Sequence, residues 1–114
     1  MDISELVAMT REITVLFNSE VGPWNASVLL TELTGELGTL ADSIMIKEGH
    51  RKPRNDEPLD LDDDVVDVMF MLVRIADYYG IDIEHAYMTM LEQTREKLEN
   101  RLNAKKREER EKNP

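Results

Sequence analysis

Acidic side chains gather at two places in this 114-residue chain, with spacings that could bind a metal ion. Seven acids fall within the twelve residues 56–67, a segment that ends in Asp64-x-x-Asp67. Glu32 and Glu36 form a second pair earlier in the chain. Residues three or four apart lie above one another on one helix face, so each pair presents two carboxylates together. Two such pairs on facing helices would form an all-oxygen site, which suits Mg²⁺ or Mn²⁺ better than zinc.

Asp67 is the acid that an ordinary solvated surface explains least well. It interrupts the segment 65–76, in which ten of twelve residues are apolar. A buried ionised carboxylate is costly unless something positive meets it. The candidates are Arg74, a base from another helix, or a metal ion. An EF-hand calcium loop starting at Asp60 is excluded, because it lacks the required glycine at its sixth position and glutamate at its twelfth.

Hydrophobic periodicity and capping residues predict four helices and an all-α fold. Five glycines, four prolines and 5% aromatic residues leave little material for a many-stranded sheet. The expected helices run from Asp2 to Asn18–Glu20, from Asn25 to about Glu48 and from Asp60 or Asp62 to Tyr79–Gly80. A fourth starts at Asp82, and its apolar edge runs out near Leu102.

The second expected helix carries an apolar stripe and a polar stripe side by side. The apolar stripe has the spacing of a buried helix face and consists of Leu33, Leu37, Leu40 and Ile44. The polar stripe has the same spacing one residue earlier and consists of Glu32, Glu36, Thr39 and Ser43. We therefore expect the leucine stripe in the core and the carboxylates at its border, about 100° around the helix.

The third expected helix is apolar on nearly every face, so it must be buried on nearly every face. Three further helices are too few to surround it, which predicts a homodimer or a homotetramer rather than a monomer with a central helix. Beyond Leu102 the residues are charged and mixed in sign, typical of a solvated helical extension or a frayed tail. We expect a helical domain at 1–102 and a charged tail at 103–114.

Composition argues against several classes of function. Acids outnumber bases 24 to 14, and the resulting net charge of −10 repels nucleic-acid backbones. The absence of cysteine excludes disulfide frameworks, zinc ribbons and thiol nucleophiles. No apolar run reaches the ~18 residues of a membrane span, and the first residues lack the layout of a secretion signal. These features predict a cytoplasmic protein without nucleic-acid or membrane partners.

Four segments carry a recognisable pattern: GELGTLAD at 35–42, KEG at 47–49, DDDVVDVMF at 62–70 and ADYYGIDIE at 76–84. Together they resemble the MazG-like family of all-α nucleoside triphosphate pyrophosphohydrolases, over about residues 25–97. The resemblance implies a four-helix bundle, assembled as dimers or tetramers, with a magnesium site. It also implies cleavage of an NTP or dNTP into NMP and pyrophosphate, for house-cleaning or nucleotide-pool control.

The resemblance assigns metal ligands by position in the family's two motifs, E-E-x-x-E and E-x-x-D. Asp64-x-x-Asp67 matches the second motif, with Asp in place of its Glu, and Asp63 falls on the preceding acid. Glu36 matches the second Glu of the first motif. The implied ligands of Mg²⁺, with Mn²⁺ possible, are thus Glu36, Asp64 and Asp67.

The first motif departs from the family pattern. Its first Glu falls on Gly35 and its last on Thr39. A shifted register uses Glu32 and Glu36 instead, with Leu33 where the second Glu belongs. Glu36, or Glu32 in the shifted register, is the expected catalytic carboxylate, which orients or deprotonates the attacking water. The alternative function is a MazG-like module that has lost turnover and acts in nucleotide binding or assembly.

Residues on the substrate side are open to two interpretations each. Lys47 lies three turns beyond the acid pair and could meet a phosphate, or it is a solvated lysine at a helix end. Trp24 could stack on a base, or it is a hydrophobic staple before the second helix. Arg51, Lys52 and Arg54 could gather phosphates, or they only keep their loop soluble.

Overall fold

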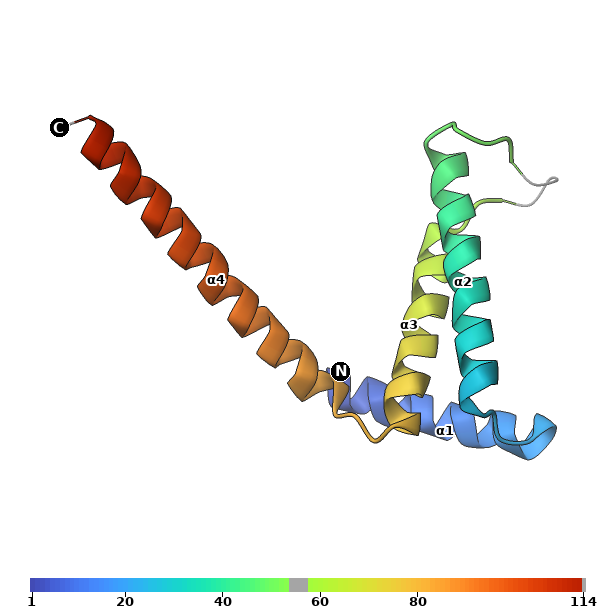
Figure 1. Cartoon of the computed structure of the whole chain (residues 1–114). Coiled ribbons are helices and arrows are strands. Elements are labelled where there is room, and N and C mark those ends of the chain that lie inside the picture. The colour runs from blue at the N-terminus through green and yellow to red at the C-terminus, as the bar shows by residue number, and fades with distance from the viewer. Residues whose placement is uncertain (54–57, 114) are drawn as a thin grey trace. The chain divides into compact units, whose positions relative to one another are not determined.

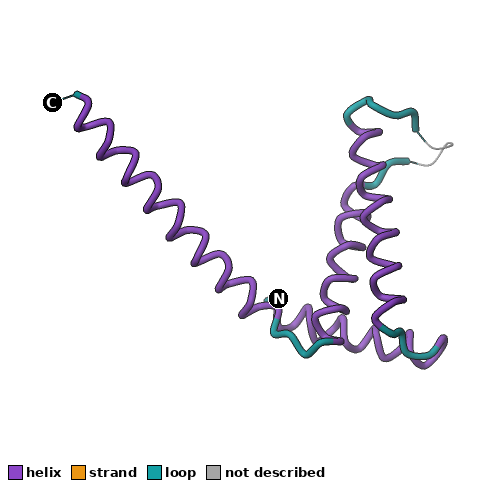
Figure 2. Tube along the Cα trace, in the orientation of Figure 1, coloured by secondary structure: helices purple, strands orange, loops and turns teal. Residues whose placement is uncertain are grey.

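The structure, a computed structural model, describes residues 1–53 and 58–113. Four helices and no strand make up the regular structure of these residues, so the all-α prediction is confirmed (Figures 1 and 2). None of the described helices combines the length and the apolar character needed to cross a membrane. The loop base Arg54 and two of the seven clustered acids, Asp56 and Glu57, lie outside the described residues. The helices are α1 (Ile3–Val21), α2 (Ala26–Lys47), α3 (Leu61–Tyr78) and α4 (Ile83–Lys112).

The beginnings of the helices follow from local sequence, as predicted. Each capping side chain accepts a hydrogen bond from the amide three residues later, which satisfies one of the free N–H groups of the first turn. At the other ends, Gly22 and Gly80 have φ values of 85° and 65°, a region that only glycine adopts readily. The caps, with hydrogen bonds of 2.9–3.1 Å, are Asp2, Asn25, Asp60 and Asp82.

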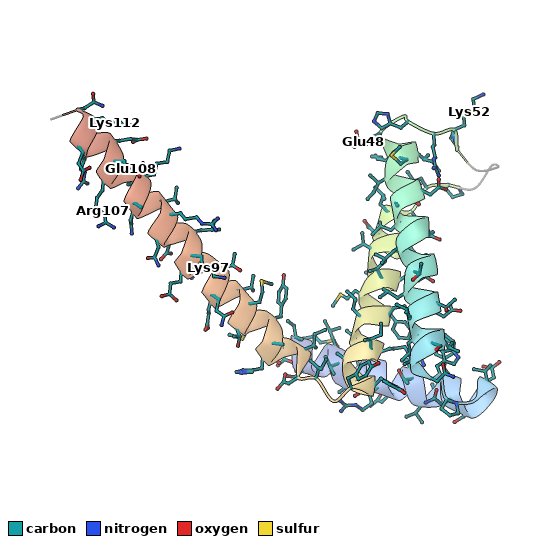
Figure 3. The ribbon with its side chains drawn as sticks, viewed as in Figure 1. Glu48, Lys52, Lys97, Arg107, Glu108 and Lys112 are labelled. Carbon is teal, nitrogen blue, oxygen red and sulfur yellow. The ribbon has the colours of Figure 1, made fainter. Side chains whose placement is uncertain are left out.

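α4 decides between the two expectations for the residues beyond Leu102. The helix continues through the charged segment to Lys112, which makes this segment a helical extension rather than a frayed tail. Oppositely charged residues four positions apart, such as Glu108 and Lys112, stabilise a solvated helix in this segment (Figure 3). The expected division into a domain at 1–102 and a tail at 103–114 stays a prediction.

Contacts within the chain define two compact units, Met1–Ile81 and Asp82–Pro114. In the first unit α2 and α3 pack against each other, and α1 packs across the end of this pair (Figure 1). Two contacts fasten α1 to α3. The rings of Phe17 and Phe70 lie 6.3 Å apart, and the Nη2 atom of Arg11 lies 2.7 Å from Oδ1 of Asp77.

The hydrophobic core of the first unit is small. About half of the apolar side chains of α2 and α3 remain exposed to a third or more, although a stable domain buries most of its large apolar residues. On α3 the exposed apolar residues include Val65, Val66, Met69 and Leu72. The buried apolar residues are Leu29, Met71, Val73 and Ala76.

The prediction that the leucine stripe of α2 is buried was wrong for a single copy of the chain. Leu37 and Ile44 are 47% and 46% exposed, whereas Ser43 of the polar stripe is only 2% exposed. Helical periodicity locates a stripe that avoids water, but it does not say whether the same chain covers that stripe. Here the polar stripe faces α3, and much of the leucine stripe stays uncovered.

Candidate metal centre

Three carboxylates converge in the first turns of α3. Asp63, Asp64 and Asp67 each offer one oxygen, and these oxygens all lie within 4.8 Å of one another. The geometry follows from helical spacing, because positions three and four apart share a face. Asp64 and Asp67 were expected as ligands. Asp63 was noted only as the acid before the motif, although its four-residue spacing from Asp67 could have identified it.

A hydroxyl from α2 holds one of these carboxylates in place. The side chain of Ser43 donates a short hydrogen bond to Oδ2 of Asp64, across the contact between α2 and α3. Ser43 is almost completely buried, so this bond is protected from competition with water. The Asp64 carboxylate is therefore oriented before any ion binds.

Replacing Ser43 by alanine is expected to lower the free energy of unfolding by about 1–3 kcal/mol, because a partly buried carboxylate oxygen loses its donor. Urea unfolding measures this change. The exposed Ser27 at the start of the same helix provides the matched control, and Ser27→Ala should change stability by less than about 0.5 kcal/mol. Equal effects of the two substitutions would show that the bond to Asp64 contributes nothing.

Glu36 brings a carboxylate from α2 toward this cluster. Partial burial raises the pKa of Glu36, and the negative charges of Asp67 and Glu32 raise it further, followed by those of Asp64 and Asp63. Like charges act this way only at short range. Within the described part of the chain, the group of oxygens within 4.8 Å includes α3 residues only, so Glu36 lies beside this group rather than inside it.

Asp67 has the same kind of environment. Burial raises its pKa most, and the charges of Asp63, Asp64 and Asp60 add to the effect. Burial and neighbouring negative charges thus disfavour the ionisation of both Glu36 and Asp67, two groups that the sequence singled out. Both a proton and a divalent cation would relieve this repulsion.

Without divalent cations, the protein is expected to lose stability as the pH rises above the ordinary carboxyl pKa of about 4. Raised carboxyl pKa values mean that the folded state holds more protons than the unfolded state. The free energy of unfolding therefore falls as pH rises from the ordinary pKa of ~4 through the raised values. Melting temperatures in EDTA test this: the parent chain should lose more stability over this range than the Glu36→Gln, Asp67→Asn double variant. Parallel curves would contradict the raised pKa values.

A cavity of about 410 Å³ adjoins the acidic cluster. Its walls combine polar groups of α2 and α3 with apolar residues from the connection between these helices. Such a site can hold a small polar molecule against an ion bound by the cluster. The lining residues are Thr39, Ser43, Ile46, Pro53, Pro58, Leu59, Asp60, Asp63 and Asp64.

The other predicted site residues lie at different distances from this centre. Glu32 is exposed on α2, close enough for its charge to affect Glu36. Lys47 is exposed in the last turn of α2, next to Ile46 of the cavity wall. Trp24 lies outside this cavity. It precedes α2, and its ring centroid lies 4.1 Å from the guanidinium carbon of Arg74 and 6.4 Å from the centroid of the Phe17 ring.

Arg74 does not neutralise Asp67, which excludes one of the candidate partners. Among the described residues, the side-chain ion pairs are Arg11–Asp77 and Arg51–Asp42. The pair formed by Arg51 also shows that this loop base binds a carboxylate of α2. Lys52 is exposed and extends from the loop after α2 (Figure 3).

Comparisons of the chain with protein-family models, with curated proteins and with solved structures find no match. The resemblance to MazG-like proteins therefore depends on the residues of this chain alone.

Proposed function

We propose that this protein is a magnesium-dependent nucleoside triphosphate pyrophosphohydrolase of the MazG-like type, which converts an NTP or dNTP into NMP and pyrophosphate. One observation carries the proposal. Glu36 of α2 lies beside the Asp63/Asp64/Asp67 group of α3, and burial and repulsion raise the pKa values of Glu36 and Asp67. Perturbed carboxyl groups beside a cavity are typical of functional sites.

The donor set fits a hard divalent cation. All candidate ligand atoms are carboxylate oxygens, which Mg²⁺ and Mn²⁺ prefer, and magnesium completes its shell with water and phosphate oxygens. When bound, the ion supplies polarisation of the phosphate oxygens and neutralises charge that develops on them. Asp64 and Asp67 would hold it, with Asp63 as a third ligand.

The remaining groups then have distinct tasks. Ser43 positions the Asp64 carboxylate through its hydrogen bond. Glu36 has a raised pKa and lies beside the cluster, which suits a group that orients the attacking water and accepts its proton. Glu32, one helical turn before Glu36, would assist Glu36 in this role. Lys47, the residue after Ile46 of the cavity wall, would attract a phosphate, whereas Trp24 would need to exchange its Arg74 contact for a base.

We also propose that the chain works as a homodimer or homotetramer in which the helices complete a bundle. The support is the set of apolar side chains that α2 and α3 leave exposed, among them Leu30, Leu37, Met69 and Leu72. Contiguous apolar surfaces of this kind mark protein–protein contacts. The acidic composition and the resemblance also lead us to propose a cytoplasmic location and a role in house-cleaning or nucleotide-pool control.

A second candidate function is a MazG-like module without turnover, which binds nucleotides or serves in assembly. One observation favours it. Thr39 lines the cavity beside Asp63 and Asp64, at a position where the preferred register of the family motif has a glutamate. A threonine there removes one metal ligand.

Magnesium titration combined with pyrophosphate release separates these functions. Mg²⁺ at about 100 times its dissociation constant should stabilise the protein by about 2.7 kcal/mol, a rise in melting temperature on the order of 10 °C. The enzyme should also release pyrophosphate from at least one member of a panel of NTPs and dNTPs, and only with Mg²⁺. Stabilisation without release from any nucleotide would favour the non-catalytic module. A chain that neither responds to Mg²⁺ nor releases pyrophosphate would refute the metal centre.

A further inference from the structure

A second cavity, of about 190 Å³, lies between α1, the start of α2 and the second half of α3. Arg74, which lines it, follows Asp67 by seven residues, about 10 Å along the helix axis at 1.5 Å per residue. The cavity shares no lining residue with the one beside the acidic cluster. It therefore requires a separate explanation.

Arg74 places a positive charge in this cavity, and no carboxylate of the described residues forms an ion pair with it. The residue is 4% exposed, and its guanidinium carbon lies 4.1 Å from the ring centroid of Trp24. Phe17 and Phe70 lie within 5.7 Å on other sides. Aromatic faces attract the cation, but they provide no acceptor in the plane of its N–H groups. The buried atom Nη1 has no hydrogen-bond partner.

Asn18 of α1 brings a second unsatisfied atom to the same cavity. Its Oδ1 atom is buried and receives no hydrogen bond. Because buried polar groups are nearly always paired, one orphan donor and one orphan acceptor in a single cavity indicate a missing occupant. That occupant must accept a hydrogen bond from Arg74 and donate one to Asn18.

The charge of the cavity favours an anion. Asp77 also lines it, but Oδ1 of this carboxylate is held by Nε and Nη2 of Arg11 at 2.8 and 2.7 Å. The carboxylate in the cavity lining is thus paired with Arg11 and not with Arg74. Desolvation lowers the pKa of Arg74, and the charge of Glu32, which does not line the cavity, acts in the opposite direction and offsets only part of this effect. The cavity volume of about 190 Å³ accommodates a small oxyanion and about two waters, since each water occupies about 30 Å³.

We propose that this cavity binds a small oxyanion that carries a proton, of which hydrogen phosphate and bicarbonate are examples. One of its oxygens accepts from Nη1 of Arg74, and its O–H group donates to Oδ1 of Asn18. The site is independent of the metal centre and of the proposed hydrolase activity.

Binding of inorganic phosphate to the full chain tests this site. Titration calorimetry in EDTA is suitable, because without divalent cations phosphate is not retained at the acidic cluster. Saturable binding is expected for phosphate and bicarbonate. Sulfate, which carries no proton near neutral pH, should bind at least tenfold more weakly. Sulfate binding as tight as that of phosphate would overturn the proposal.

Asn18→Asp is the decisive variant. It places a carboxylate next to Arg74, so the variant should melt at a higher temperature and bind phosphate at least tenfold more weakly. Asn100→Asp, an exposed change of equal charge on α4, should alter neither property. Asn18→Leu removes the acceptor without adding charge, and it should weaken phosphate binding while sulfate binding stays unchanged. Absence of saturable phosphate binding by the parent chain would show that water alone fills the cavity, which overturns the proposal.

Discussion

Asp67→Asn and Glu36→Gln are each expected to lower magnesium-dependent pyrophosphate release by about 100-fold or more, while the helical fold remains at least as stable. The loss of rate follows because Asp67 would hold the ion and Glu36 would activate water, and positioned acid–base groups alone contribute roughly 10²–10⁴ in rate. The stability should rise, because each substitution removes a carboxylate whose ionisation is disfavoured by burial and by neighbouring negative charges. Steady-state pyrophosphate release and thermal melting in EDTA measure the two effects.

Asp62→Asn is the matched control for these variants. Asp62 belongs to the same acidic segment, but it is exposed and lies outside the Asp63/Asp64/Asp67 group. Its substitution should leave turnover within about twofold of the parent and cost at most the ~0.3–1 kcal/mol of a favourable helix-dipole contact. If Asp67→Asn and Glu36→Gln hydrolyse nucleotides as fast as Asp62→Asn does, the proposed site is wrong.

The double variant Leu37→Lys, Leu72→Lys is expected to convert the assembled protein into monomers. Both leucines are nearly half exposed in the single chain, on the outer faces of α2 and α3. A stable interface buries about 1,200–2,000 Å² of surface, with few charges at its centre. Two buried lysines without partners would each cost several kcal/mol. Light scattering coupled to size exclusion should show the mass falling to that of one 13.2 kDa chain.

Thr31→Lys controls for the added charge, because Thr31 is exposed on α2 and lies about 120° around the helix from Leu37. This variant should keep the parent mass. Circular dichroism should show that the double variant retains its helices, since neither leucine belongs to the small core of the chain. A parent chain that is already monomeric at micromolar concentration would refute the proposed assembly.

Local sequence alone determined the helices of this protein and their beginnings. Asp2, Asn25 and Asp82 cap their helices as predicted, because a cap involves only a side chain and an amide three residues away. For α3 the sequence left Asp60 and Asp62 open, and Asp60 is the cap. The pairing of Asp64 with Asp67 was also readable, since helical spacing alone places them together. For the charged segment beyond Leu102 the sequence left a helical extension and a frayed tail open, and α4 continues through it as a helix to Lys112.

Only the tertiary structure decided which groups meet across helices. It turned the polar stripe of α2 toward α3, joined Ser43 to Asp64, and placed Arg74 against Trp24 rather than near Asp67. These contacts depend on the rotation and register of helices that are joined by a loop. Period and propensity describe each helix about its own axis, so they leave that rotation free until packing selects it.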